Sequence, residues 1–381
     1  MKTKKIFVVG PGRSGTTLLR TLIDNHEEIL LWPFEFNYYN RIYHLLRDDK
    51  KKYSINEYYF YLKDDLNNFN DLYKGDLGDT EYKVINFDYS KFLKYFVDNK
   101  IEYTPKEFLI YLEEKYYECL EQKPKQPKYF VIFHNDPSKY LLNDFPDANF
   151  IFCLRNPIDL YISTKKYYFK ACELTGRDPS CVYRGYSANS QFNTLMEASI
   201  IPILYCDYWI SSTYIRSKFV IKLEDLRNDP TKLIDDLCGF LDIKVTKSLF
   251  KTTFMGQKHY SNLSNEKNPN SEIIKSYKNF NINKELSKFE IYWLNNILCN
   301  RKIFSVYNIK SDKVKINILS LFVTLKFELP NYFKESNKSN FTKYLIRILL
   351  RYCFFPYNYI NNRLVLFFSN YYNLLKKWPT K

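Results

Sequence analysis

The stretch from Ile6 to Thr17 constrains this chain most, because it joins a strand, a tight turn and a helix start. Ile6 to Val9 form a short apolar run typical of a buried strand, and the glycine-rich segment Gly10 to Gly15 then turns the chain. Thr16 and Thr17 begin an amphipathic helix. Free N–H groups and the positive end of the helix dipole point at one spot in such an arrangement, so the sequence predicts an anion cradle.

The spacing of the glycines indicates which kind of anion this loop would bind. Gly10 and Gly15 are separated by four residues, as in the phosphate-binding P-loop of nucleoside triphosphatases. Position 16 is Thr, where that pattern requires the Lys that reaches the terminal phosphates. We therefore expect a phosphate-like ligand other than a nucleoside triphosphate.

A second phosphate signal follows another apolar run, Phe150 to Leu154. Arg155 stands at the end of this predicted strand, and Ser163 lies two turns into the helix that should follow Pro157. The planar guanidinium can grip a phosphate through two hydrogen bonds, and the Ser hydroxyl adds a neutral donor. The alternative for Arg155 is a buried ion pair with Asp159.

Short apolar strands alternate with helices along the first part of the chain. This pattern predicts an α/β fold, with a P-loop-like parallel sheet flanked by helices and ligands at the carboxyl ends of the strands. Asp229 and Pro230 are expected to cap one helix, and Thr104 with Glu107 another. The strands expected after the first are Ile29–Trp32 (ending at Pro33), Tyr129–Phe133, Asn149–Leu154 and Phe219–Leu223.

The chain should divide into an α/β domain over residues 1–300, with a helical insertion at about 40–125, and a helical extension over 301–381. The extension is aromatic and basic, and we expect it either to pack against the core or to contact a membrane surface. Residues 170–192 lack periodicity and hold Gly176, Pro179 and Gly185, so we expect a mobile loop there.

The net charge and the cysteine content limit which ligands and partners we expect. The net charge is +15, but the Lys residues are dispersed and no nucleic-acid-binding motif accompanies them, so we expect no nucleic-acid partner. The eight Cys are scattered without a CxxC pair, which favours buried thiols over a zinc site and leaves a Cys172–Cys181 disulfide open.

The apolar stretch near the N-terminus is too short for a signal peptide, and no run is long enough to span a bilayer, so we expect a cytoplasmic protein.

Together the motifs resemble the sulfotransferases that use 3′-phosphoadenosine-5′-phosphosulfate (PAPS). Those enzymes carry Pro-x-Ser-Gly-Thr-Thr and, later, Arg-[Asp/Asn]-Pro with a Ser eight residues after the Arg. Here these are Gly12-Arg-Ser-Gly-Thr-Thr17 and Arg155-Asn-Pro with Ser163. The segment Leu223 to Pro230 is similar to a third motif of the family, Tyr-Glu-Asp-Leu-x-x-x-Pro. Among its branches, the chain most resembles the tyrosylprotein sulfotransferases and related bacterial enzymes.

The resemblance implies roles for individual residues. Gly12, Arg13, Ser14, Gly15, Thr16 and Thr17 would hold the 5′-phosphosulfate end of PAPS, and Arg155 and Ser163 its 3′-phosphate. Arg13 would also stabilise charge on the leaving group. Glu35 follows an aromatic-rich strand and is the candidate general base, because a carboxylate among aromatics would have a raised pKa. His134 is the runner-up, as base or as positive charge; nearby, Asn135 replaces a Lys common in the family.

The expected function is transfer of a sulfuryl group from PAPS to an acceptor hydroxyl on a glycan, a lipid or a peptide tyrosine, with no metal. Two alternatives stay open at this point. One is a kinase or NTPase with a degenerate P-loop, which the missing Lys at position 16 argues against. The other is a non-catalytic protein that binds anions or a membrane surface.

Overall fold

The computed structural model describes residues 3–47, 51–74, 87–96, 101–133, 139–175, 191–258, 280–286, 290, 291, 294 and 307. The chain forms two compact units. The first unit comprises residues 1–160 and 197–278, and the second comprises residues 161–196 and 279–381. The sheet belongs to the first unit, as do the residues that directly follow β6 as far as Leu160.

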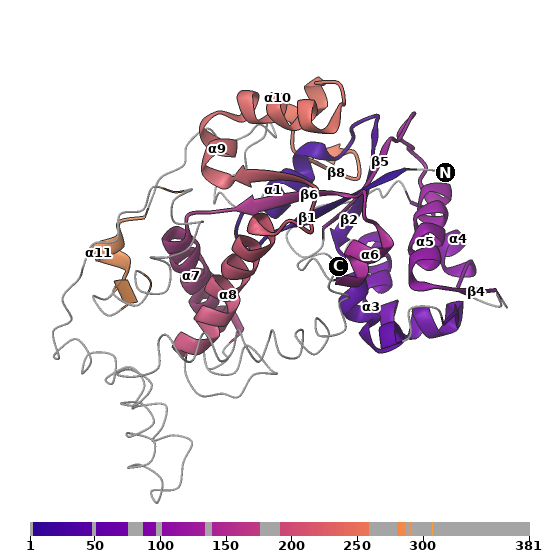
Figure 1. Cartoon of the computed structure of the whole chain (residues 1–381), viewed down its shortest axis with the longest axis horizontal. Coiled ribbons are helices and arrows are strands. Elements are labelled where there is room, and N and C mark those ends of the chain that lie inside the picture. Colours follow the sequence, from indigo (N-terminus) through magenta and orange to yellow (C-terminus); the bar gives the residue numbers. More distant parts are fainter. Residues whose placement is uncertain are drawn as a thin grey trace, which may run out of the picture. The chain divides into compact units, whose positions relative to one another are not determined.

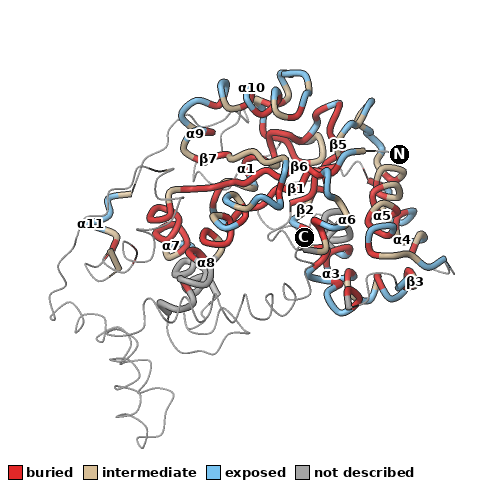
Figure 2. Tube along the Cα trace, in the orientation of Figure 1, coloured by how far each residue is buried: buried red, intermediate tan, exposed pale blue. Residues whose placement is uncertain are grey.

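A parallel five-stranded sheet is the centre of the first unit, with strand order β2-β5-β1-β6-β7 (Figure 1). All its neighbouring strands pair in parallel. Figure 2 shows buried residues along β1, β2, β5 and β6, as the apolar runs predict, whereas the edge strand β7 is mostly half-buried. The α/β fold class is therefore confirmed. The strands are β1 (Lys4–Val9), β2 (Ile29–Glu35), β5 (Tyr129–Phe133), β6 (Asn149–Leu154) and β7 (Ser217–Lys222).

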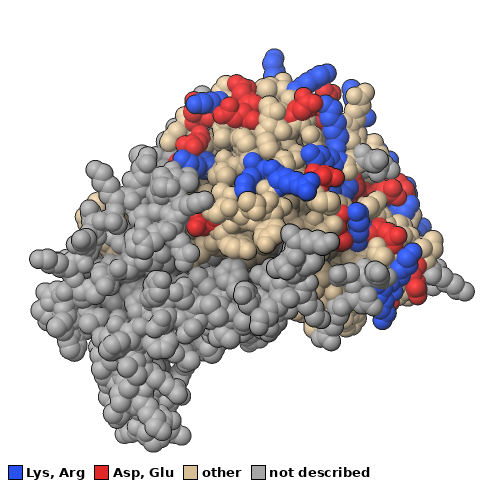
Figure 3. Space-filling view, in the orientation of Figure 1, with Lys and Arg blue, Asp and Glu red and all other residues tan. Residues whose placement is uncertain are grey.

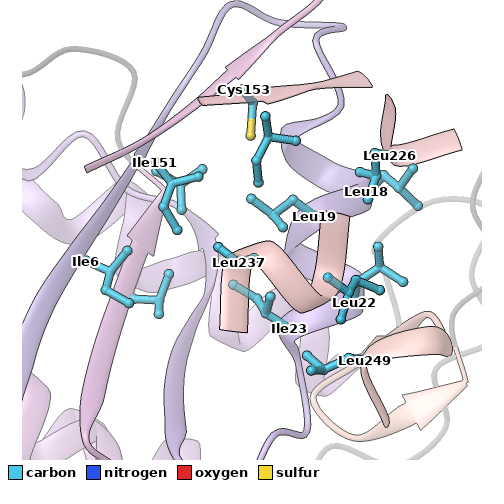
Figure 4. Close-up of a cluster of buried hydrophobic side chains, with 14 of the residues drawn as sticks. Ile6, Leu18, Leu19, Leu22, Ile23, Ile151, Cys153, Leu226, Leu237 and Leu249 are labelled. Atoms are coloured by element: carbon cyan, nitrogen blue, oxygen red, sulfur yellow. The ribbon is translucent and has the colours of Figure 1, made fainter. Parts of the chain in front are cut away.

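One face of the sheet packs against three helices, α1 (Thr16–Ile23), α9 (Leu223–Asn228) and α10 (Pro230–Leu241). Alternate side chains of a strand point to opposite faces, so Ile6 and Ile151 share this side with the Leu side chains of the helices. Figure 4 shows these side chains packed around α1. As the sequence predicts, Asp229 caps α10, its carboxylate accepting a hydrogen bond from the Lys232 amide at 3.2 Å.

The opposite face of the sheet is aromatic. Phe7 contacts Phe145 and Phe150, with ring centroids 5.9 and 5.6 Å apart. Trp32 packs on Tyr116 of α5 (Pro105–Cys119), with ring centroids 5.0 Å apart. The many Phe and Tyr residues of the chain therefore build a core layer of their own here.

The predicted insertion at 40–125 is helical over most of its described length. Thr104 and Glu107 form the predicted capping box at the start of α5. A two-stranded ribbon, β3 (Tyr53–Ser54) with β4 (Glu102–Tyr103), is the exception. The other elements of this region are α2 (Tyr38–Arg41), η1 (Tyr43–Arg47), α3 (Ile55–Lys74) and α4 (Tyr89–Lys94). Between β5 and β6 lies α6 (Lys139–Asp144).

Several predicted boundaries are wrong. The strand predicted at Phe219–Leu223 is β7 (Ser217–Lys222), because Leu223 already begins α9. β2 continues through Pro33 to Glu35, because it is an edge strand with a register shift between Leu31 and Glu35, where a missing N–H is tolerated. The predicted loop at 170–192 is helical at both ends, since α7 (Pro157–Thr175) and α8 (Gln191–Ser211) extend into it. Residues 176–190 between them lie outside the described part of the chain.

The second unit joins α7 to the segment around α11 (Ile282–Glu285). The Tyr161 hydroxyl donates to Glu290 Oε1 at 3.0 Å, and Lys165 Nζ lies 2.8 Å from the same oxygen. Lys166 pairs with Glu285 at 2.6 Å. The predicted extension at 301–381 lies, apart from Tyr307, outside the described residues.

The first unit is completed by η3 (Lys247–Phe250) and a short hairpin of β8 (Thr253–Phe254) and β9 (Gln257–Lys258). The described cysteines Cys119, Cys153, Cys206 and Cys238 are buried free thiols, whereas the side chains of Cys172 and Cys181 lie outside the description. Among the described helices, none is both long and apolar enough to cross a membrane. Figure 3 shows Lys and Arg interspersed with Asp and Glu on the visible face of the described residues.

Candidate functional site

The loop between β1 and α1, residues 10–15 (the glycine loop), has a shape that only glycine permits at two positions. Gly15 has φ +95°, and a Cβ there would lie 2.7 Å from Leu223 Cδ1. A Cβ on Gly10 would lie 2.5 Å from the carbonyl oxygen of Cys153. The loop is therefore pressed closely against β6 on one side and the start of α9 on the other.

Ser14 is the buried polar residue of the glycine loop. Its side chain is 1% exposed, and its Oγ has no hydrogen-bond partner among the described residues. Its amide donates to the Pro11 carbonyl oxygen at 3.2 Å, so this amide is engaged within the loop. A buried hydroxyl without a partner is costly, and a ligand oxygen would satisfy it. Gly12 and Thr17 are exposed on the same loop and helix start.

Arg155 brings the second predicted phosphate segment to the glycine loop. It follows β6, which pairs directly with β1, so the two strand ends lie side by side. Its side chain is buried, and Nη1 donates to the carbonyl oxygen of Arg13 at 3.2 Å. The Arg155 guanidinium thus contacts the backbone of the glycine loop. This hydrogen bond links two motifs that are 142 residues apart in sequence.

The residues after Arg155 are held by a carboxylate to which sequence reasoning assigned no role. Glu224 Oε1 accepts a hydrogen bond from the Asn156 amide at 2.8 Å. Asn156 Oδ1 in turn accepts from the Ile158 amide at 2.9 Å, capping the start of α7. Burial raises the pKa of Glu224, while the hydrogen bond from Asn156 and the charge of Arg155 oppose that shift. Glu224 lies in the Leu223–Pro230 motif, but the sequence does not show that its carboxylate binds the Asn156 amide.

Glu35 is the last residue of β2 and pairs in register with Phe133 at the end of β5. Because β5 separates β2 from β1, Glu35 lies about 10 Å across the sheet from the end of β1. Its side chain is exposed, so the enclosed aromatic setting predicted for it is wrong. Trp32 and Phe36 instead turn inward and stack on each other, with ring centroids 4.8 Å apart.

The two remaining predicted site residues are His134 and Ser163. His134 follows Phe133 directly and lies outside the described residues, so its role stays a prediction. Ser163 is buried on α7 and belongs to the second unit. Its role toward a 3′-phosphate likewise stays a prediction.

A cavity of about 200 Å³ lies away from these loops, on the side of the sheet where the strands begin (the amino edge). It is lined by the turn after α1, the start of β2, the end of α5 and the β8–β9 hairpin. Asp24 lines it at the carboxyl end of α1, about 14 Å along the helix from Gly15. The described residues contain no group of three or more His, Cys, Asp or Glu placed to hold a metal ion.

Comparison with solved structures found several similar proteins. The sulfotransferase domain from the curacin biosynthetic pathway is 16% identical, with a TM-score of 0.42, over 66% of this chain and 77% of its own. The sulfotransferase domain from the Synechococcus PCC 7002 olefin synthase is 18% identical, with a TM-score of 0.36, over 66% and 76%. A sulfotransferase from Alicyclobacillus acidocaldarius is 14% identical, with a TM-score of 0.35, over 68% and 88%.

A search of curated proteins found no match. The family model described as the sulfotransferase family matches residues 5–247. This range holds the glycine loop, Arg155 and the Leu223–Pro230 segment, and it is more than half of the 381 residues. The chain therefore belongs to the sulfotransferase family.

Proposed function

We propose that this chain transfers the sulfuryl group of PAPS to an acceptor hydroxyl on a glycan, a lipid or a peptide tyrosine. PAPS would supply the sulfuryl group and leave as adenosine 3′,5′-bisphosphate. The observation that carries the proposal is the hydrogen bond from Arg155 to the backbone of Arg13, because it brings together the two segments that the sequence predicts to bind phosphate.

The glycine loop would hold the 5′-phosphate end of the donor. The buried Oγ of Ser14, which has no partner among the described residues, supports this role, as do the position of Thr16 at the N-terminus of α1 and the dipole of that helix. A Cβ added to Gly12 would meet no atom of the described residues within 4 Å. The exposed Arg13 would neutralise the charge that develops on the leaving phosphate.

Arg155 would hold the 3′-phosphate, with Ser163 as a second donor on the following helix. The Arg155 guanidinium is buried and already oriented by the Arg13 carbonyl, so little side-chain freedom would be lost on binding. This preorganisation favours a ligand with phosphate groups at two positions over one with a single phosphate.

Glu35 is our candidate for the general base. Its exposed carboxylate at the end of β2 would take the proton of the acceptor hydroxyl while the acceptor oxygen forms its bond to sulfur and the bridging phosphate oxygen leaves. Glu35 and the glycine loop both lie at the carboxyl ends of their strands, with β5 between those strands. His134 remains the alternative base. Placement in the tyrosylprotein branch, and with it a tyrosine acceptor, stays a prediction.

The donor assignment is tested by calorimetric titration with adenosine 3′,5′-bisphosphate. We expect the wild type to bind and Arg155→Ala to lose about 10- to 100-fold in affinity, the value of a charged hydrogen bond to phosphate. Arg216→Ala removes the same charge from an exposed position before β7 and should leave binding unchanged. Unchanged binding in Arg155→Ala, or magnesium-dependent turnover of ATP, would contradict the proposal.

The base is tested by transfer from labelled PAPS to a panel of phenols, glycans and lipids. Glu35→Gln should lower turnover about 10²- to 10⁴-fold while the affinity for adenosine 3′,5′-bisphosphate stays the same. Glu27→Gln is a matched control, because Glu27 is also exposed but lies at the amino edge of the sheet. If Glu35→Gln turned over at the wild-type rate, the base would have to be sought elsewhere, with His134→Gln as the next variant.

A further inference from the structure

The ends of β6 and β7 lie side by side, and the segments that follow them meet. The two strands pair along their whole length, with Leu154 opposite Lys222 at the last position. Arg155 and Asn156 come next on one strand, and Leu223 and Glu224 on the other. The start of α9 is thus a neighbour of the predicted 3′-phosphate segment, although 68 residues separate Asn156 from Glu224 in sequence.

Glu224 holds the backbone of the residue that follows Arg155. Its Oε1 accepts from the Asn156 amide at 2.8 Å, and the Asn156 carbonyl oxygen accepts from the Leu160 amide at 2.8 Å. The Asn156 side chain accepts from the Ile158 amide at 2.9 Å. Asn156 is therefore fixed from both sides, which fixes the point from which the Arg155 side chain departs.

The same turn of α9 also supports the glycine loop. Leu223 Cδ1 lies 2.7 Å from the place that a Cβ of Gly15 would occupy. Arg155 links the two segments directly, through its hydrogen bond to the Arg13 carbonyl oxygen. Leu223 and Glu224 therefore contact the two halves of the proposed donor site, one residue for each half.

We propose that Glu224 is a positioning residue that clamps Asn156 and thereby aims the Arg155 guanidinium at the 3′-phosphate. This role rests on the proposed function, because it requires that Arg155 binds that phosphate. Glu224 acts through Arg155 and does not itself touch the nucleotide. Its effect should therefore be confined to ligands that carry a 3′-phosphate, whereas a general role in folding would affect all nucleotides alike.

The test compares affinities for adenosine 3′,5′-bisphosphate and for adenosine 5′-phosphate, which lacks the 3′-phosphate. We expect Glu224→Ala to lower the preference for the bisphosphate about tenfold or more and to leave the affinity for the monophosphate unchanged. Glu224→Gln keeps an acceptor oxygen for the Asn156 amide, so its preference should stay within about threefold of the wild type. In the Arg155→Ala background, Glu224→Ala should cause no further loss.

Asp225→Ala is the matched control, since it removes an exposed carboxylate one residue further along α9 and should leave the preference unchanged. Three results would contradict the positioning role of Glu224. These are an unchanged preference in Glu224→Ala, an equal loss of affinity for both ligands, and a Glu224→Gln variant that binds the bisphosphate as weakly as Glu224→Ala. These outcomes differ from failure of the proposed function, in which the wild type itself would show no preference that depends on Arg155.

Discussion

At the scale of single residues, Gly15 occupies a backbone conformation that residues with a Cβ adopt only at a cost. Its φ of +95° lies in the left-handed region, and Leu223 fills the space where a side chain would go. We therefore expect Gly15→Ala to lower the free energy of unfolding by about 1–3 kcal/mol, from backbone strain together with the displaced leucine.

Gly12 provides the comparison for Gly15. A Cβ added to Gly12 would meet no atom of the described part of the chain within 4 Å, so Gly12→Ala should change the free energy of unfolding by less than about 0.5 kcal/mol. Urea denaturation of the two variants measures the difference. Equal destabilisation by both substitutions would mean that the close approach to Leu223 does not limit this loop.

Glu35 shows why the setting of a site residue is hard to predict from local sequence. The aromatic residues around it suggest an enclosed carboxylate, but Trp32 and Phe36 are fully buried while Glu35 is exposed. Which side of an edge strand faces the core depends on the register shift before Glu35 and on the helices that cover the sheet. Neither is visible in the local pattern.

At the scale of elements, the apolar runs and cap residues were sufficient to predict the strands of the parallel sheet, though not all of their bounds, and the starts of α5 and α10. These features are local, because they depend on neighbours a few residues apart. The pairing of Glu224 with Asn156 spans 68 residues and depends on β6 and β7 being neighbours. Strand order follows from the whole packing arrangement, so this part of the candidate site could not be predicted from the motif that contains it.

Glu28 connects three elements at the amino edge of the sheet. Its side chain is buried, with Oε1 2.5 Å from Lys128 Nζ, and Oε2 accepts from the Lys244 amide at 2.9 Å. The hydrogen bonds from Lys128 and Lys244 lower the pKa of Glu28. We expect Glu28→Ala to cost about 1–2 kcal/mol of folding free energy at pH 7, with Glu27→Ala as the exposed control.

The pH dependence of that cost has a definite sign. Since the pKa of Glu28 is lower in the folded chain than in the unfolded one, its stabilisation is fully present above the unfolded value of about 4.3 and is lost as the pH falls through the lower, folded value. Urea denaturation of wild type and Glu28→Ala should therefore converge in acid. A difference that stayed constant with pH would show that the ionised carboxylate is not what stabilises this edge.

At the scale of the whole molecule, the described residues of the first unit form two candidate sites for a small molecule, at opposite ends of the strands of one sheet. The glycine loop, Arg155 and Glu224 follow the carboxyl ends of their strands, as expected for ligand sites in parallel sheets. The cavity near Asp24 lies at the amino edge. The buried hydroxyl of Ser14 and the oriented guanidinium of Arg155 favour the carboxyl edge for a phosphorylated nucleotide.

Hydrogen exchange with and without adenosine 3′,5′-bisphosphate separates these two places in a single measurement. Binding at the carboxyl edge should slow amide exchange in residues 10–17, 154–160 and 222–226, because the ligand orders segments that only tertiary contacts bring together. Residues 24–28, 123–128 and 242–246 at the amino edge are the internal reference and should keep their rates. Protection of the amino edge alone would put the nucleotide in the cavity near Asp24, and the roles of the glycine loop and Arg155 would then have to be abandoned.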